Sequence, residues 1–139
     1  MQFELGFMET PLPAKHAVAV LVLQEDRILA VRRPDDDDEL PGIWGLPAGT
    51  CRGSETIEDV IRRVGRDKLG VILHPVRRLE SGFQVRPSYR LNMELWEATM
   101  DGTPSRSQWQ WAGLDLLQPG VAKGSLCCAL AIQNKGRVT

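Results

Sequence analysis

The segment Gly49–Val71 constrains the fold of this chain more than any other part, because it carries a helical apolar pattern bounded by glycines. Apolar residues recur in it at intervals of three and four, the spacing that places side chains on one face of an α-helix. The residues of this face are Ile57, Val60, Ile61 and Val64, with Lys68 at the next position along it. The pattern predicts one amphipathic helix.

Three small residues set the expected limits of this helix. Ser54 is a candidate N-cap, because its hydroxyl oxygen can accept a hydrogen bond from a free backbone N–H of the first turn. Gly70 is expected to end the helix. Gly65 lies inside it, where glycine costs about 1 kcal/mol relative to alanine and where the missing side chain would let a strand approach closely. The helix therefore depends on the packing of its apolar face.

Short apolar segments on both sides of this helix predict strands. Residues Ala17–Leu23 are almost continuously apolar, as in a strand covered on both faces, and a polar turn separates them from a partner strand at Ile28–Val31. Further strands are expected at Val71–Leu73 and Tyr89–Ala98, with a turn at Asp101-Gly102. Arginine-rich connections are expected around Arg77, Arg78, Arg86 and Arg90, a short apolar segment at Leu114–Leu117, and a second helix at Ser125–Gln133. This mixture predicts an α/β (α+β) fold.

Composition limits the class of protein. A chain of 139 residues is long enough for one domain, residues 1–139, in which residues 1–15 form an N-terminal extension or an edge segment. Apolar residues make up 42% and charged residues 25%, which are ordinary values for a globular protein. Because 17 basic residues nearly balance 18 acidic ones, no basic field is available to hold long nucleic acid. We expect any nucleotide partner to be small.

Cysteine usage and the first residues predict a location. Cys51, Cys127 and Cys128 have neither the spacing of a zinc site nor that of a disulfide framework, and we expect them to be small buried side chains in a reducing compartment. Residues 1–15 lack the basic start and apolar run of a signal peptide, and no stretch approaches the 18 apolar residues of a membrane span. The sequence predicts a cytoplasmic protein with no membrane partner.

The spacing of Gly49, Glu55, Arg63, Gly70 and Val71 resembles that of the Nudix box. That motif runs Gly, five residues, Glu, seven residues, then Arg-Glu-apolar-any-Glu-Glu-any-Gly-apolar. The preceding segment LPGIWGLPAGT is similar to the family's entry segment at Trp44, Leu46, Pro47 and Gly49, with Ala48 in place of a glycine. The resemblance extends upstream over HAVAVLVLQEDRILAVRRP and downstream over WQWAGLDLLQPG, and so covers most of the chain.

The resemblance implies a fold and an activity. The fold is a mixed β-sheet sandwiched between helices. The activity is hydrolysis of a nucleoside diphosphate linked to another moiety, with Mg²⁺ or Mn²⁺ and an activated water molecule. Trp44, Pro47, Glu55, Arg63 and Gly70 would be structural residues of the motif, and Glu55 would brace the loop before the helix against Arg63.

The second half of the motif departs from the family at its metal-binding positions. Val64, Asp67 and Lys68 stand where the family has three acidic residues, so Asp67 is the remaining candidate as metal ligand and catalytic residue. An ammonium about 4 Å from a unit positive charge costs about 4 kcal/mol at an effective dielectric constant near 20. We therefore expect a weakened metal site. One hypothesis is metal-dependent hydrolysis. The alternative is a degenerate nucleotide-binding or regulatory module that has no metal and forms a homodimer interface.

Three structural arrangements were open for the altered positions. In the first, carboxylates of the acidic run Asp35–Glu39 complete the metal site, whereas this run is otherwise a solvated loop. In the second, Lys68 turns to solvent. In the third, Lys68 replaces the metal as a fixed phosphate-binding cation. Glu58 and Asp59 lie on another side of the helix, where ion pairs with Arg62 and Arg63 are expected.

The other candidate site residues come from outside the acidic positions. Glu94 and Glu97 lie near the position where the resemblance implies a catalytic base. Because residues three apart in a strand point to opposite faces, only one of them could serve, and Glu94 is preferred. Arg33 and Gly49 are candidate substrate-binding residues: arginine suits phosphate oxygens, and a glycine provides either a positive φ or room for a phosphate. Two tryptophans, Trp109 and Trp111, point the same way if extended, to pack the core or to stack on a base. The histidines, His16 and His74, are expected to be structural.

Overall fold

A mixed seven-stranded sheet organises residues 11–134, the part of the chain that this computed structural model describes. Residues 1–10, which belong to the expected N-terminal extension, lie outside the described part. In chain order the elements are β1 (Ala14–Gln24), β2 (Arg27–Arg32), β3 (Trp44–Gly45), β4 (Ala48–Thr50), α1 (Ile57–Val64), the π-helical segment η2 (Gly65–Leu69), β5 (Ile72–Val85), β6 (Arg90–Asp101), β7 (Gln108–Ala112), the 3₁₀ segment η3 (Leu114–Leu117), α2 (Gln118–Ala122) and α3 (Leu126–Gln133).

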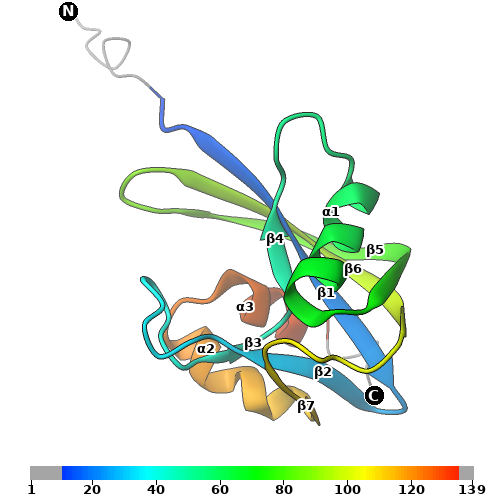
Figure 1. The fold of residues 1–139 in the computed structure, drawn as a ribbon. Coiled ribbons are helices and arrows are strands. Elements are labelled where there is room, and N and C mark those ends of the chain that lie inside the picture. The colour runs from blue at the N-terminus through cyan, green and yellow to red at the C-terminus, as the bar shows by residue number, and fades with distance from the viewer. Residues whose placement is uncertain (1–10, 135–139) are drawn as a thin grey trace, which may run out of the picture.

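Strand β1 lies at the centre of the sheet, whose strand order is β3-β2-β1-β6-β5 (Figure 1). It pairs antiparallel with β2 and β4 and parallel with β6, while β5 continues the sheet antiparallel to β6. The predicted strands at Ala17–Leu23 and Ile28–Val31 are confirmed as parts of β1 and β2. The apolar run was expected to be covered on both faces, and Val18–Leu21 are fully buried.

Helices cover both faces of the sheet. Alternate residues of β1 enter two separate cores: Ala17, Ala19 and Leu21 pack toward α3, whereas Val18, Val20 and Val22 pack toward α1. This alternation is the two-residue period of a strand buried on both sides. The sheet sandwiched between helices, which the resemblance implied, is therefore the observed architecture (Figure 1).

Helix α1 begins at Thr56 and not at Ser54, so the predicted N-cap was wrong. The Thr56 hydroxyl accepts a hydrogen bond from the Asp59 backbone N–H at 3.1 Å, and the Asp59 carboxylate accepts one from the Thr56 N–H at 3.0 Å. This reciprocal capping box satisfies two otherwise free donors. The Thr56-x-x-Asp59 spacing is visible in the sequence and was the better signal.

The end of the helix and its internal glycine are as predicted. Gly70 ends η2 in the left-handed region at φ 76°, and its N–H donates to the Gly65 carbonyl. A β-carbon on Gly65 would lie 2.8 Å from Leu73 Cγ and 3.0 Å from the Val71 carbonyl oxygen. Glycine at position 65 thus allows the close approach of β5 that compensates for its low helix propensity.

Strands β5 and β6 are longer than the sequence indicated, and the expected arginine-rich connection at Arg77 and Arg78 was wrong. Both residues lie inside β5, between shifts of register after Pro75 and after Arg78. Because β5 is an edge strand with one solvated face, its polar side chains resemble a loop in sequence. The turn after Asp101 is confirmed, with Gly102 at φ 101°.

The C-terminal part closes the second face of the sheet. Helix α3 begins after the N-cap Ser125, close to the predicted helix, and its Cys127 and Cys128 are buried as expected, whereas Cys51 is half-buried. Trp109 and Trp111 of β7 pack edge to face, with ring centroids 6.2 Å apart, against the core on the α1 side. Their expected role in packing is confirmed. No helix between residues 11 and 134 is long and apolar enough to cross a membrane.

Candidate functional site

A cavity of about 580 Å³ lies beside the segment that leads into α1. Its walls come from β2, the β2–β3 loop, β3–β4, η2, the end of the β5–β6 hairpin and the start of α3. Cations dominate the charged lining: the basic residues are Lys15, Arg32, Arg33, Lys68 and Arg86, and the acidic residues are Asp37, Asp38 and Glu39. Leu46, Leu91 and Met93 form part of its apolar wall.

The loop before α1 is fixed by Glu55 and Arg63. Arg63 Nε and Nη2 donate to the two Glu55 carboxylate oxygens at 2.8 and 2.9 Å, and Nη2 also donates to the Thr50 carbonyl at 2.6 Å. The bidentate bond from Arg63, joined by a backbone bond from Arg52, lowers the pKa of Glu55 to about 2. Their contact is the brace that the resemblance implied.

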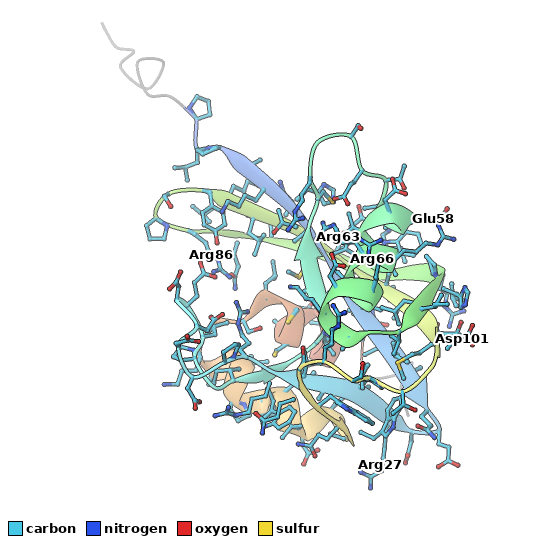
Figure 2. The ribbon with its side chains drawn as sticks, viewed as in Figure 1. Arg27, Glu58, Arg63, Arg66, Arg86 and Asp101 are labelled. Atoms are coloured by element: carbon cyan, nitrogen blue, oxygen red, sulfur yellow. The ribbon has the colours of Figure 1, made fainter. Side chains whose placement is uncertain are left out.

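Arg63 is consequently unable to pair with Asp59, so that expected ion pair was wrong. The Asp59 carboxylate is used by the capping box at Thr56, one turn earlier. The neighbouring pair is present: Arg62 Nη1 lies 3.4 Å from Glu58 Oε2, and both side chains are exposed. These charges face solvent on the outer side of α1, as Figure 2 shows for Glu58.

Gly49 and Val64 meet where β4 passes under α1. Among residues 11–134 the glycines with positive φ do not include Gly49, so of the two expected reasons for a glycine here, a positive φ or room for a phosphate, the first does not apply. A β-carbon on Gly49 would lie 2.7 Å from Val64 Cγ2, and Val64 is only 1% exposed. Gly49 therefore permits close packing of the helix on the strand. Position 64, acidic in the family, is a core position in this chain.

Lys68 turns inward and lines the cavity. Its ammonium donates a hydrogen bond to the Ala48 backbone carbonyl, just before Gly49. Burial lowers the pKa of Lys68, and the positive charges of Arg33, Arg63 and Arg52 lower it further. Lys68 as a whole is an exposed residue that borders both the cavity and solvent, and its hydrogen bond to Ala48 holds the ammonium at the cavity wall. A cation rather than a carboxylate occupies this edge of the cavity.

Lys68 belongs to the described cavity lining and Asp67 does not, although a regular helix would place the two with Val64 on one face. The Asp67 carboxylate accepts a hydrogen bond from Arg66 Nε at 2.8 Å and is half exposed, and this bond is the main cause that lowers its pKa. Asp67 is not part of the described lining of the cavity. The π-helical turn of η2 breaks the 3.6-residue register on which the expected shared face depended.

Glu94 also lies outside the described cavity lining. It stands next to Val18 in the pairing of β6 with β1, on the face that packs toward α1. Glu94 accepts a hydrogen bond from Trp96 Nε1 at 2.8 Å and contacts His16 Nε2 at 3.1 Å. Glu97 pairs instead with Arg77 at 3.1 Å. The roles of Asp67 and Glu94 as catalytic residues stay predictions.

Arg33 lines the cavity and is held by the acidic loop. Its Nε donates to Asp37 Oδ2 at 3.1 Å, and the same carboxylate accepts the backbone N–H groups of Leu40 and Glu39. These bonds, led by the one from Leu40, lower the pKa of Asp37. Three carboxylates of the acidic loop, Asp35, Asp37 and Glu39, thus pair with arginines.

The residues at this site do not fit a resident divalent cation. Magnesium prefers several oxygen ligands, usually including one or two carboxylates. Within residues 11–134 no group of three or more His, Cys, Asp or Glu side chains converges on one point. The backbone carbonyl of Ala48 is bonded to the Lys68 ammonium, which repels a cation.

Several lining residues were missed in the sequence because they come together only through the sheet. Lys15 lies 4.2 Å from the centre of the Tyr89 ring, an interaction that follows from the parallel pairing of β1 with β6. Arg86 lies beyond the predicted strands and reaches the cavity because β5 is long. No local pattern in the sequence indicates either contact.

Comparison with known proteins places this chain in a family. The sequence model of the NUDIX domain matches residues 13–124. The MutT protein of Methanosarcina mazei Go1 has a similar structure, with a TM-score of 0.73 and 16% identity over 94% of this chain and 96% of that one. The E. coli ORF135 protein gives a TM-score of 0.72 and 18% identity over 88% and 91% of the two chains. No curated protein sequence matches.

Two similar structures carry substrate names. A UDP-X diphosphatase gives a TM-score of 0.70 and 17% identity over 94% of this chain and 63% of that one. An ADP-ribose pyrophosphatase from Streptococcus suis gives 0.56 and 20% identity over 76% of each chain. The family match covers most of the sequence, so this chain belongs to the NUDIX domain family. At these identities the structural likeness shows the fold and not the substrate.

Proposed function

We propose that this chain binds a nucleoside diphosphate linked to another moiety, with Lys68 as the fixed cation at the diphosphate. The observation that carries the proposal is the position of the Lys68 ammonium, inside the cavity and bonded to the Ala48 carbonyl. An ammonium has three donors. One is used by Ala48, which leaves two for phosphate oxygens.

The surroundings of Lys68 favour an anionic ligand. Arg33 also lines this cavity, and the positive charges of Arg33, Arg63 and Arg52 together lower the pKa of Lys68. A bound diphosphate would offset both this repulsion and the loss of hydration that accompanies burial. We therefore expect binding to favour the protonated form of Lys68.

Hydrolysis is the second candidate function. It is favoured by the family and by Asp67, whose carboxylate is half exposed and has a lowered pKa, so that it is available as an anion. A lysine does not generate a nucleophilic water as a metal ion does. Turnover is accordingly expected to be slow compared with that of a site holding several carboxylates. A cytoplasmic location and a homodimer stay predictions.

Calorimetric titration with ADP and inorganic pyrophosphate tests the binding proposal. Lys68→Met keeps the length of the side chain and removes its charge, and the exposed Lys123→Met is the matched control. A charge-assisted hydrogen bond contributes about 1.5–3 kcal/mol, so affinity should fall about tenfold or more in Lys68→Met. Equal affinity in the two variants would contradict the role of Lys68.

Product release tests the hydrolase candidate. Nucleoside triphosphates, UDP-sugars and ADP-ribose would be incubated with the protein and Mg²⁺, then Mn²⁺, beside Asp67→Asn. Release that disappears in Asp67→Asn would establish hydrolysis that depends on Asp67. Binding without release across the panel would leave the nucleotide-binding module as the function.

A further inference from the structure

Three arginines belong to the described lining of the cavity, and each is paired with a carboxylate of the β2–β3 loop. Arg32 Nη2 lies 2.6 Å from Asp35 Oδ1, and Arg33 Nε lies 3.1 Å from Asp37 Oδ2. The third pair, 3.0 Å between Arg86 Nη1 and Glu39 Oε1, joins segments that are distant in sequence. The acidic run therefore neutralises the groups that suit phosphate oxygens best.

Glu39 differs from the other two carboxylates in what it joins. Its second oxygen, Oε2, accepts a hydrogen bond from the Tyr89 hydroxyl at 3.0 Å. One side chain of the β2–β3 loop thus holds two residues at the end of the β5–β6 hairpin. Figure 2 shows Arg86 projecting from this end of the hairpin toward the loop. Glu39, Arg86 and Tyr89 all line the cavity.

We propose that Glu39 is an autoinhibitory latch, which ties the acidic loop to the β5–β6 hairpin and competes with a diphosphate ligand for Arg86. The inference rests on the proposed function in one respect, namely that the ligand is an anion. When the latch opens, Arg86 and Lys15 remain at this wall as cations, with Lys15 above the Tyr89 ring. Opening thus makes the wall more positive and releases the loop from the hairpin, while Asp37 still holds the loop at Leu40 and Arg33.

Exposure and hydrogen bonding distinguish Glu39 from Asp37. Asp37 is 20% exposed and fixes the loop through the N–H groups of Glu39 and Leu40, so it shapes the loop in any state. Glu39 is 46% exposed, and its side-chain contacts reach only the hairpin. An ion pair as exposed as Glu39–Arg86 is weak, so another anion can displace the Glu39 carboxylate from Arg86.

The test compares Glu39→Gln with two variants that change the same charge. Glu58→Gln removes an exposed glutamate that pairs with Arg62 on α1, outside the described lining of the cavity. Asp38→Asn removes a carboxylate of the cavity lining for which the described contacts include no ion pair. Glu58→Gln controls for the change in net charge. Asp38→Asn controls for the loss of a negative charge at the cavity when the Glu39–Arg86 contact is kept.

Two measurements are made on the full chain. Calorimetry with inorganic pyrophosphate should show about three- to fivefold tighter binding in Glu39→Gln than in wild type, the range expected when a competing exposed ion pair is lost. The gain in affinity should be smaller in Asp38→Asn, and Glu58→Gln should show none. Cleavage of the ligand-free loop by endoproteinase Asp-N should be several-fold faster in Glu39→Gln than in wild type or Glu58→Gln.

The outcomes separate this inference from the proposed function. Pyrophosphate binding that is unchanged or weaker in Glu39→Gln would overturn the latch, because Glu39 would then position Arg86 rather than compete for it. If neither wild type nor Glu39→Gln binds pyrophosphate, the proposed function is wrong. The proposed competition between Glu39 and a diphosphate is then wrong as well. In that case, faster cleavage of the loop in Glu39→Gln would still show that Glu39 ties the loop to the hairpin. Unchanged cleavage would overturn this tie as well.

Discussion

The two halves of the segment Gly49–Leu69 keep the family pattern to different degrees. In the first half, Glu55 and Arg63 have the spacing of the motif, and they form a bidentate ion pair that also reaches the Thr50 carbonyl. In the second half, Val64 is a core residue and Lys68 donates to the Ala48 carbonyl. The brace that shapes the loop is present, whereas two of the three positions that are acidic in the motif carry Val64 and Lys68 and only Asp67 keeps a carboxylate.

This difference teaches that the geometry and the chemistry of such a site are separable. The Glu55–Arg63 pair positions the backbone beside the cavity, and no hydrogen bond between residues 11 and 134 joins this pair to Lys68, although the charge of Arg63 contributes to the lowered pKa of Lys68 after burial. The space at position 64 is filled by a valine against Gly49. A fold can therefore retain the brace of the motif while the net negative charge of the three other positions is lost, and each half can be tested by its own substitutions.

The largest expected effect comes from substitutions in the second half of the segment, at positions 64 and 68. Val64→Glu with Lys68→Glu would bury a carboxylate at a position that is 1% exposed. An unpaired buried charge costs about 3–5 kcal/mol, so we expect a lower unfolding temperature without metal and a rise with Mg²⁺ or Mn²⁺, in proportion to metal binding. Wild type and Lys68→Gln should show no such rise. Thermal unfolding with and without metal measures both, and equal profiles would show that these positions do not form a metal site.

The next effect concerns the contact between η2 and β5. Gly65→Ala gains helix propensity of about 1 kcal/mol, yet its new methyl group would meet Leu73 and the Val71 carbonyl. Overpacking costs about 1–3 kcal/mol, so we expect a net loss of about 1 kcal/mol. Urea unfolding measures the change. A more stable alanine variant would mean that β5 moves away at little cost.

In the first half, removal of the N-cap should have a similar or smaller effect. Thr56→Ala removes the hydroxyl that accepts the Asp59 N–H, and loss of an N-cap costs about 1 kcal/mol. Ser54→Ala should change the free energy of unfolding by less than about 0.5 kcal/mol, as surface substitutions do. The reverse order in urea unfolding would place the start of α1 at Ser54.

The smallest effect depends on pH. The pKa of Glu55 is lowered from 4.5 to about 2 in the folded protein, so the folded state favours its ionised form. The resulting stabilisation is fully present above pH 4.5 and is lost as the pH falls toward 2. Glu55→Gln should therefore lower the unfolding temperature at neutral pH, and its difference from wild type should shrink between pH 4.5 and 2. A difference that is constant over this range would mean that Glu55 is not held ionised.

The sequence by itself determined the parts that depend on near neighbours. The apolar spacing of α1, its end at Gly70 and the two-sided burial of β1 follow from periods of 3.6 and 2 residues, which are properties of the local backbone. The contact of Glu55 with Arg63 was implied by the resemblance to the family motif, and it forms because Glu55 lies in the loop before the N-cap, from which it reaches back to the helix. Even the true N-cap was present, as Thr56-x-x-Asp59.

Only the tertiary structure decided the character of the site. Whether Lys68 faced solvent or the cavity depended on how closely β4 approaches α1 and on the π-helical turn of η2. The contact of Glu39 with Tyr89 joins residues 50 positions apart, and that of His16 with Glu94 joins residues 78 apart. Local periodicity carries no information on such pairs, since they are brought together by strand pairing across the sheet.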